Sequence, residues 1–222
     1  ISCDWGYYSA YCDLINSSID NYHLNIHYHL VLPQGFIISD LDTNIHKRVG
    51  ISYEIESLET REQDRHYKTY YSLVRYLVAG KVSSLYGQKL LISDIDIVFE
   101  NNITKVFSGI SDDEAALVFS KSDLPWTKIM AGFNVFGRNF FTKDYYLLLC
   151  NFLIENLDSN LNFWMLDQIA LDVAYVNSSR DTISYIKSMN TLIEFKILQQ
   201  QDNSKYKYLA RDNIIKKISE IK

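Results

Sequence analysis

The sequence predicts an α/β fold in which helices flank a mixed, mostly parallel central sheet. Three observations lead to this prediction. Short apolar runs of strand type alternate along the chain with longer segments of helical periodicity. The hydrophobic fraction of 47% is ordinary for a globular protein, and 222 residues can bury a sizeable core. With only 8 Gly and 2 Pro, no linker stands out, so we expect a single domain over 1–222, as a whole protein or as part of a longer chain.

The first quarter of the chain is predicted to hold one helix and several strands. Apolar residues recur at helical spacing in 9–22, whereas in 25–32 they alternate along one face, which is the strand period. Pro and Gly in 33–35 then break the pattern. The runs 35–42 and 49–55 are short and rich in β-forming residues, so we expect two further extended segments there.

The middle of the chain is predicted to hold a long helix and three strands. Segment 65–87 has no Pro and repeats apolar residues every three to four positions, so we expect a helix that ends at Gly80 and is followed by a second, short one. The runs 89–99, 115–120 and 131–137 are apolar and short enough to be strands.

The last third is predicted to return to helices. Helical spacing of apolar residues continues through 144–157 and 163–176. The final forty or so residues are mixed, with a short strand at 193–198 and a charged tail.

Charge and composition exclude several classes of protein. The net charge of −5 argues against a nucleic-acid binder, which needs a basic face. No apolar run approaches the roughly 20 residues that cross a bilayer, and the first residues have neither a basic nor an apolar signal region. The 3 cysteines lack metal-site spacing and are expected as free thiols. We therefore expect a cytoplasmic protein.

Two carboxylates interrupt the apolar run KLLISDIDIVFE, residues 89–100. On a strand, Asp94 and Asp96 point to the same face about 7 Å apart, and burying two such charges requires compensation. A divalent cation such as Mg²⁺ or Mn²⁺ supplies it, since both prefer oxygen ligands. A second D-x-D triplet, at 40–42, is followed by a polar turn and is interpreted as a turn or a helix N-cap.

The order of segments resembles the nucleotide-sugar glycosyltransferases of the GT-A type, and within them the retaining galactosyltransferase and glycogenin-like group. This resemblance implies a Rossmann-like fold. The stretches that carry it are SCDWGYYSAYCDLINSSI, YKTYYSLVRYLV, LLISDIDIVF, AGFNVFGRN and WMLDQIALDVAY. They span most of the chain, and they are similar in turn to the first strand and helix, the helix before the metal motif, the metal motif, the strand that faces the donor sugar, and the helix after it.

The resemblance implies roles for residues of the donor site. Asp96 is implied as the more direct ligand of Mn²⁺ or Mg²⁺, and Asp94 as a ligand that also reaches the ribose. Asp4 and Tyr7 are implied to flank the base. Arg75 is implied to approach the diphosphate or Asp94, and its alternative is a surface cation–π pair with a tyrosine.

On the sugar side, the resemblance implies that Gly132 and Asn134 line the donor-sugar pocket. Asp167 and Gln168 are implied on its far side as candidate catalytic residues. From the residues alone, the alternative for Asn134 is a buried amide that satisfies a turn, and the alternative for Asp167 is a solvated or backbone-holding carboxylate. One feature departs from that group: all 5 histidines precede the metal motif, whereas a C-terminal histidine usually completes the metal shell.

The sequence thus predicts a metal-dependent hexosyltransferase that moves a sugar from a nucleotide-diphosphate donor, with a UDP-sugar favoured, to a carbohydrate or other hydroxyl acceptor. Trp126, after Pro125 in a loop, is the candidate platform for an acceptor sugar. Two alternatives remain: a non-catalytic module that binds a sugar nucleotide or glycan, and a haloacid-dehalogenase-like phosphohydrolase built on the triplet at 40–42. The sequence does not indicate an oligomeric state.

Overall fold

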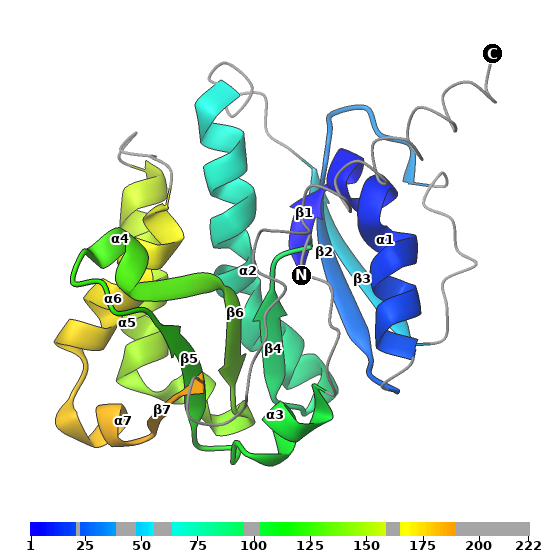
Figure 1. Ribbon diagram of the computed structural model, residues 1–222. Coiled ribbons are helices and arrows are strands. Elements are labelled where there is room, and N and C mark those ends of the chain that lie inside the picture. The colour runs from blue at the N-terminus through cyan, green and yellow to red at the C-terminus, as the bar shows by residue number, and fades with distance from the viewer. Residues whose placement is uncertain (21–22, 39–47, 56–63, 96–102, 159–164, 190–222) are drawn as a thin grey trace. The chain divides into compact units, whose positions relative to one another are not determined.

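The structure is a computed structural model that describes residues 1–20, 23–38, 48–55, 64–95, 103–158 and 165–189 (Figure 1). The chain divides into two compact units. The first comprises Ile1–Glu56, Asp94–Thr104 and Lys196–Lys222, and the second comprises Ser57–Ser93 and Lys105–Phe195. Each unit has its own sheet and its own buried core. The prediction of one domain over 1–222 stays a prediction.

The first unit is built on a parallel sheet of three strands in the order β1-β2-β3. Its elements are β1 (Ser2–Asp4), α1 (Trp5–Asp20), β2 (Ile26–Leu32) and β3 (Val49–Ile55). The predicted helix is present and begins earlier than expected, because α1 starts directly after β1. Of the extended run predicted at 35–42, residues 36–38 form no strand, and 39–42 lie outside the described residues.

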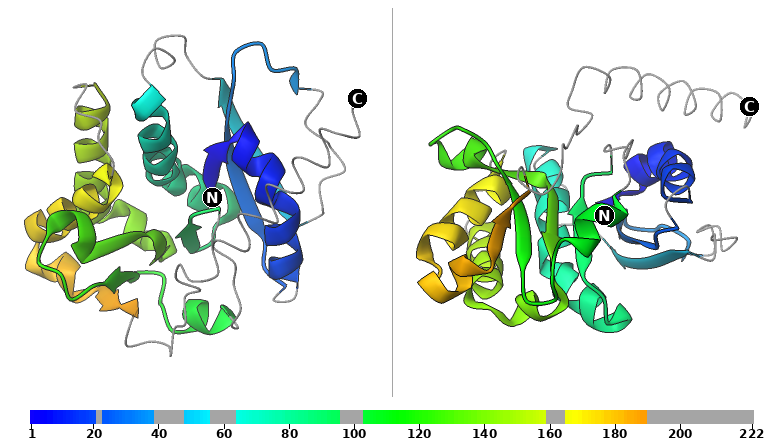
Figure 2. Two further views of the ribbon diagram at one scale, coloured as in Figure 1. Left: turned by 45° about the horizontal axis from the view of Figure 1, so that its top comes forward. Right: turned by 60° about the horizontal axis from the view of Figure 1, so that its bottom comes forward.

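The core of the first unit lies between α1 and one face of this sheet, as the views in Figures 1 and 2 show. Tyr11 and Ile15 of α1 are buried together with Tyr28, Leu30 and Leu32 of β2. The face predicted for β2 is confirmed, since these three residues join the core with α1. The other face is not exposed, however, because His29 and Val31 are buried as well.

The second unit is built on a mixed sheet in the order β4-β6-β5-β7. Strand β6 is antiparallel to both β4 and β5, and β7 is parallel to β5. The elements of this part of the chain are α2 (Asp64–Tyr86), β4 (Leu90–Ser93), α3 (Thr104–Ser108), β5 (Ala115–Phe119), α4 (Pro125–Lys128), β6 (Ile129–Phe136), the 3₁₀ helix η3 (Arg138–Thr142), α5 (Asp144–Asp158), α6 (Leu166–Asn177), α7 (Arg180–Ser184) and β7 (Ile186–Ser188). Residues of α2, α5 and α6 share one buried core with β4, β5 and β6.

One expectation for this unit is wrong, because α2 does not end at Gly80 but runs on to Tyr86. Glycine stands at position 80 because α2 closely contacts α5 there, and not because the helix ends. The Gly80 N–H donates to the Tyr146 hydroxyl at 2.9 Å, and a Cβ at position 80 would lie 3.1 Å from that oxygen. Gly80 therefore makes room for α5, while Gly87, with φ of +62°, follows the last residue of the helix.

The mixed α/β architecture predicted from the sequence is confirmed. The helices predicted at 144–157 and 163–176 correspond to α5 and α6, and the strands predicted at 115–120 and 131–137 to β5 and β6. The strand predicted at 89–99 is present as β4, whose bounds are Leu90–Ser93. Asp96, the triplet at 40–42 and the strand predicted at 193–198 lie outside the described residues. Among the helices described, none is long and apolar enough to cross a bilayer.

Candidate functional site

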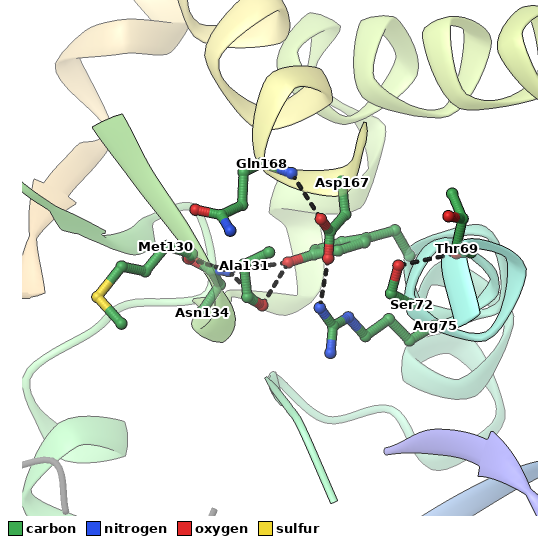
Figure 3. Close-up of polar contacts among 9 residues, drawn as sticks. Thr69, Ser72, Arg75, Met130, Ala131, Asn134, Asp167 and Gln168 are labelled. Atoms are coloured by element: carbon green, nitrogen blue, oxygen red, sulfur yellow. Dashed lines mark hydrogen bonds and ion pairs between the residues drawn. The ribbon is translucent and has the colours of Figure 1, made fainter. Parts of the chain in front are cut away.

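A buried ion pair joins two helices of the second unit. The Arg75 guanidinium of α2 donates from Nη2 to Asp167 Oδ2 of α6 at 2.7 Å (Figure 3). Both side chains are more than nine-tenths buried, at 4% and 9% exposure. The pair therefore fixes the first turn of α6 against the middle of α2, across 92 residues of sequence.

Arg75 also stacks on an aromatic ring, as the sequence allowed. Its guanidinium carbon lies 5.3 Å from the centroid of the Tyr76 ring. The pair is not at the surface, however, because Arg75 is 5% exposed and Tyr76 is fully buried. The predicted cation–π contact is thus present, in a buried place, and Arg75 is also the charge partner of Asp167, which was not predicted. The approach of Arg75 to a diphosphate or to Asp94 stays a prediction.

Asp167 has both carboxylate oxygens engaged. While Oδ2 accepts from Arg75, Oδ1 accepts the backbone N–H of Gln168 at 2.9 Å. The residue before the helix, Met165, adopts a left-handed conformation with φ of 71°, so the chain turns sharply into α6. A carboxylate in the first turn of a helix is also favoured by the helix dipole. Gln168, next along the helix, is partly exposed.

Strand β6 carries a bulge where the donor-sugar residues were predicted. Met130 pairs with Val118 and Val135 pairs with Ala116, so the stretch 131–134 of β6 lies opposite Leu117 alone. A bulge leaves backbone groups without ladder partners and re-aims the side chains around it. Gly132, in the middle of the bulge, is partly exposed.

The Asn134 side chain satisfies the carbonyl groups of this bulge. Its Nδ2 group lies 3.0 Å from Met130 O and 3.1 Å from Ala131 O, and it also donates to the Tyr76 hydroxyl at 2.9 Å. Tyr76 in turn donates its own O–H to Ala131 O at 2.7 Å. The buried-amide interpretation of Asn134 therefore describes these contacts, and Asn134 is fully buried.

We call Arg75, Tyr76, Asn134, Asp167 and Gln168 the α2–α6 polar cluster (Figure 3). Burial raises the pKa of Tyr76 far above its ordinary value, so its hydroxyl stays protonated and remains a donor. Tyr76 was missed by sequence reasoning. The apolar pattern of its helix predicts a buried aromatic ring at this position. Nothing in the local sequence indicates that the Tyr76 hydroxyl bonds the bulge of β6.

The first unit holds the start of the metal motif. Asp94 follows β4 directly and is partly exposed, whereas Ile95 is 6% exposed and belongs to the buried cluster of Cys3, Tyr11 and Tyr28. Ile95 thus anchors the motif in the core, next to the strand that ends at Asp4. Among the described residues, no group of three His, Cys, Asp or Glu side chains gathers at a distance suited to a metal.

Asp4 and Tyr7 lie where β1 passes into α1. Asp4 Oδ1 accepts the Tyr7 backbone N–H at 2.7 Å, which is the geometry of a helix N-cap. The Tyr7 ring is 42% exposed and stacks on Tyr11, with the centroids 6.0 Å apart and the planes 13° apart. The structure therefore brings Asp4, Tyr7 and Asp94 into one unit, and Arg75, Gly132, Asn134, Asp167 and Gln168 into the other.

The sheets and helices match a GT-A-type α/β fold, in which parallel and mixed sheets are flanked by helices. The chain is similar to the structure of the galactosyltransferase LgtC, which was determined in complex with donor and acceptor sugar analogues. The TM-score is 0.50 at 12% sequence identity, and the match covers 84% of this chain and 70% of that chain. Identity this low shows the fold alone. No protein-family model and no curated protein matches the chain.

Proposed function

We propose that this protein is a metal-dependent glycosyltransferase that moves a hexose from a nucleotide-diphosphate donor, with UDP favoured as the nucleotide, to a hydroxyl acceptor. The observation that carries the proposal is the position of the D-x-D motif within a GT-A-type fold. Asp94 stands at the carboxyl end of β4, and ligands of open α/β sheets bind outside the carboxyl ends of strands.

The donor set of the motif fits a hard divalent cation. Asp94 and Asp96 would hold Mn²⁺ or Mg²⁺, since both side chains offer carboxylate oxygens. Of the described part of the motif, Asp94 is partly exposed, while its neighbour Ile95 is buried in the core of the first unit. When bound, the ion supplies Lewis-acid stabilisation of the charge on the departing diphosphate.

Within the first unit, Asp4 and Tyr7 form a base-binding edge under this proposal. The N-cap bond to the Tyr7 N–H fixes the Asp4 carboxylate at the end of β1. The Tyr7 ring, braced by Tyr11, presents an exposed aromatic face on which a flat base can stack. Asp4 then accepts a hydrogen bond from a ring N–H of the base, which favours uracil or guanine over a base with only acceptors at that edge.

Within the second unit, the α2–α6 polar cluster positions Gln168. The Arg75–Asp167 pair sets the first turn of α6, and this turn presents Gln168. Because both Asp167 oxygens are engaged, we assign Asp167 to positioning and to the orientation of Gln168, whose amide can both donate to and accept from sugar hydroxyls. Asn134 and Tyr76 hold the bulge that contains Gly132, which is partly exposed and has no side chain of its own.

Turnover of donor sugars tests the proposal. Purified protein is incubated with Mn²⁺ and a panel of UDP- and GDP-hexoses, and release of the nucleoside diphosphate is measured. We expect release from at least one donor, its loss on chelation, and its loss in Asp94→Asn and Asp96→Asn. Asp40→Asn and Asp42→Asn are matched controls, since they make the same change in the other D-x-D triplet, and both should keep the wild-type rate.

The non-catalytic module is the second candidate, and the engaged carboxylate of Asp167 favours it. A module would bind the sugar nucleotide together with the metal, and over hours it would release no nucleoside diphosphate from that donor. The phosphohydrolase alternative loses support, because residues 36–38, just before its motif, form no strand. Release of inorganic phosphate from a phosphomonoester, abolished by Asp40→Asn, would revive it.

A further inference from the structure

The loop 120–128, between β5 and β6, is held together by its own hydroxyl groups. Ser120 Oγ donates to Thr127 O at 2.5 Å, and Thr127 Oγ1 donates to Ser122 Oγ at 2.6 Å. Ser120 Oγ also accepts the backbone N–H of Ser122 at 3.1 Å, and Ser122 Oγ accepts that of Leu124 at 3.2 Å. The loop is therefore pre-organised, and binding to it costs little ordering entropy.

This braced loop exposes apolar side chains at its tip. Leu124 is 50% exposed and Trp126 is 44% exposed, and Pro125 between them opens the short helix α4. A tryptophan carries the largest apolar surface of any residue, so leaving nearly half of it in water has a cost that a bound partner removes.

The loop is anchored to the helix that carries Asp167. Lys128 is the last residue of α4, and its Nζ lies 2.8 Å from Oδ1 of Asp172 in α6. The Asp172 side chain is 8% exposed. Figure 1 shows α4 against α6, and the two elements are in contact. Trp126 is therefore held at a fixed position relative to the first turn of α6, where Asp167 and Gln168 lie.

The charges around the tip select the class of partner. Lys121 and Asp123 are both exposed, and their opposite charges cancel. The charge of Lys128 is already paired with that of Asp172. A neutral rim gives no attraction to an anionic lipid surface or to nucleic acid. It suits a neutral molecule with an apolar face and hydroxyl groups, since a carboxylate accepts from hydroxyls and an ammonium donates to them.

From these observations we infer that the loop 120–128 is the acceptor-sugar platform, on which the apolar C–H face of a pyranose ring stacks against Trp126 while Asp123 and Lys121 contact its hydroxyls. The inference rests on the proposed function in one respect: the bound sugar is the acceptor of the transfer. The binding itself requires no catalysis.

The test is sugar binding by saturation-transfer NMR and by titration, with methyl β-glucopyranoside, methyl β-galactopyranoside and cellobiose as probes and glycerol as the ring-free control. We expect the ring sugars to bind and glycerol not to bind. Trp126→Ala should weaken binding about tenfold or more, because it removes the stacking contact, and Trp126→Phe should weaken it less. Tyr86→Ala is the matched control, since Tyr86 is 46% exposed at the end of α2 and should leave binding unchanged.

Three results would overturn the inference: no ring sugar binds, Trp126→Ala binds as the wild type does, or Trp126 is needed instead for binding to phosphatidylserine vesicles or for self-association in light scattering. Nucleotide binding, measured on the same variants, keeps the two proposals apart. Normal UDP binding without sugar binding contradicts the platform alone, whereas sugar binding without UDP binding contradicts the proposed function alone.

Discussion

Arg75 and Asp167 form the buried ion pair of the second unit. Both were expected near a substrate, and in the structure they face each other, with side chains that are 4% and 9% exposed. Opposite charges at 2.7 Å compensate the cost of burial only while both are present. Removing one leaves the other buried without its charge partner, which is why such pairs are sensitive to single substitutions.

We therefore expect Asp167→Asn to lower the free energy of unfolding by about 3 kcal/mol, as measured by urea denaturation. The control is Asp112→Asn, which breaks the exposed pair of Arg138 and Asp112, 3.4 Å apart with side chains 51% and 43% exposed. That change should cost less than about 1 kcal/mol. Similar losses in the two variants would show that the buried pair does not hold α6 on α2.

At the scale of elements, the packing of α2 against α5 depends on a missing side chain. In an exposed helix, Gly→Ala stabilises by roughly 1 kcal/mol. At Gly80 the sign should reverse, because the new Cβ would lie 3.1 Å from the Tyr146 hydroxyl. That hydroxyl cannot easily retreat, since it donates to Tyr76 O at 2.7 Å and its ring packs on Phe141.

We expect Gly80→Ala to lower the melting temperature, in contrast to the usual gain. Adding Tyr146→Phe tests the cause, because removal of the hydroxyl relieves the close contact. Gly80→Ala should therefore cost less in the Tyr146→Phe background than in the wild type. Equal costs in both backgrounds would mean that the contact with Tyr146 is not what places glycine at position 80.

Strands β2 and β3 share a polar contact that depends on pH. Ser52 Oγ lies 2.8 Å from His27 Nε2 and 2.8 Å from His29 Nδ1, so its one hydroxyl hydrogen serves one ring and the other ring must donate. Burial, the largest cause, lowers the pKa of His27 to about 4 from 6.5. The unfolded chain binds this proton below about pH 6.5, whereas the folded chain binds it only near pH 4.

Folding stability from this group is thus complete above about pH 6.5 and falls as the pH drops toward 4. We expect the wild type to lose stability between pH 7.5 and pH 5, and His27→Gln to lose less over the same interval. His23→Gln, at an exposed position, should keep the wild-type dependence. Parallel curves for His27→Gln and the wild type would contradict the effect of burial at this site. The readout is the unfolding free energy at each pH.

At the scale of the whole molecule, the fold class follows from local patterns, while the polar cluster does not. Strand alternation at 25–32 and helical spacing at 144–157 predict β2 and α5 because each pattern reflects burial of one face. Even the early start of α1 had a local signal, since Asp4 is a favoured N-cap residue.

The contacts between distant residues had no such signal. Asn134 meets Tyr76 across 58 residues, and Arg75 meets Asp167 across 92, so no window of sequence contains both partners. The bulge in β6 depends on pairing with β5, and Gly80 depends on Tyr146, 66 residues later. Residue types indicate which side chains are able to bind a ligand. Only the tertiary arrangement decides which of these side chains pair with one another and which face outward.

A GT-A-type fold with a D-x-D motif at the end of β4 makes nucleotide binding through a metal the property to measure first. Calorimetric titration with UDP, with and without Mn²⁺, is carried out on the wild type, Asp96→Asn and the control Asp42→Asn. We expect UDP to bind the wild type and Asp42→Asn only with Mn²⁺, and Asp96→Asn not to bind. Binding that needs no metal, or that survives in Asp96→Asn, would contradict the assignment of this motif as the donor site.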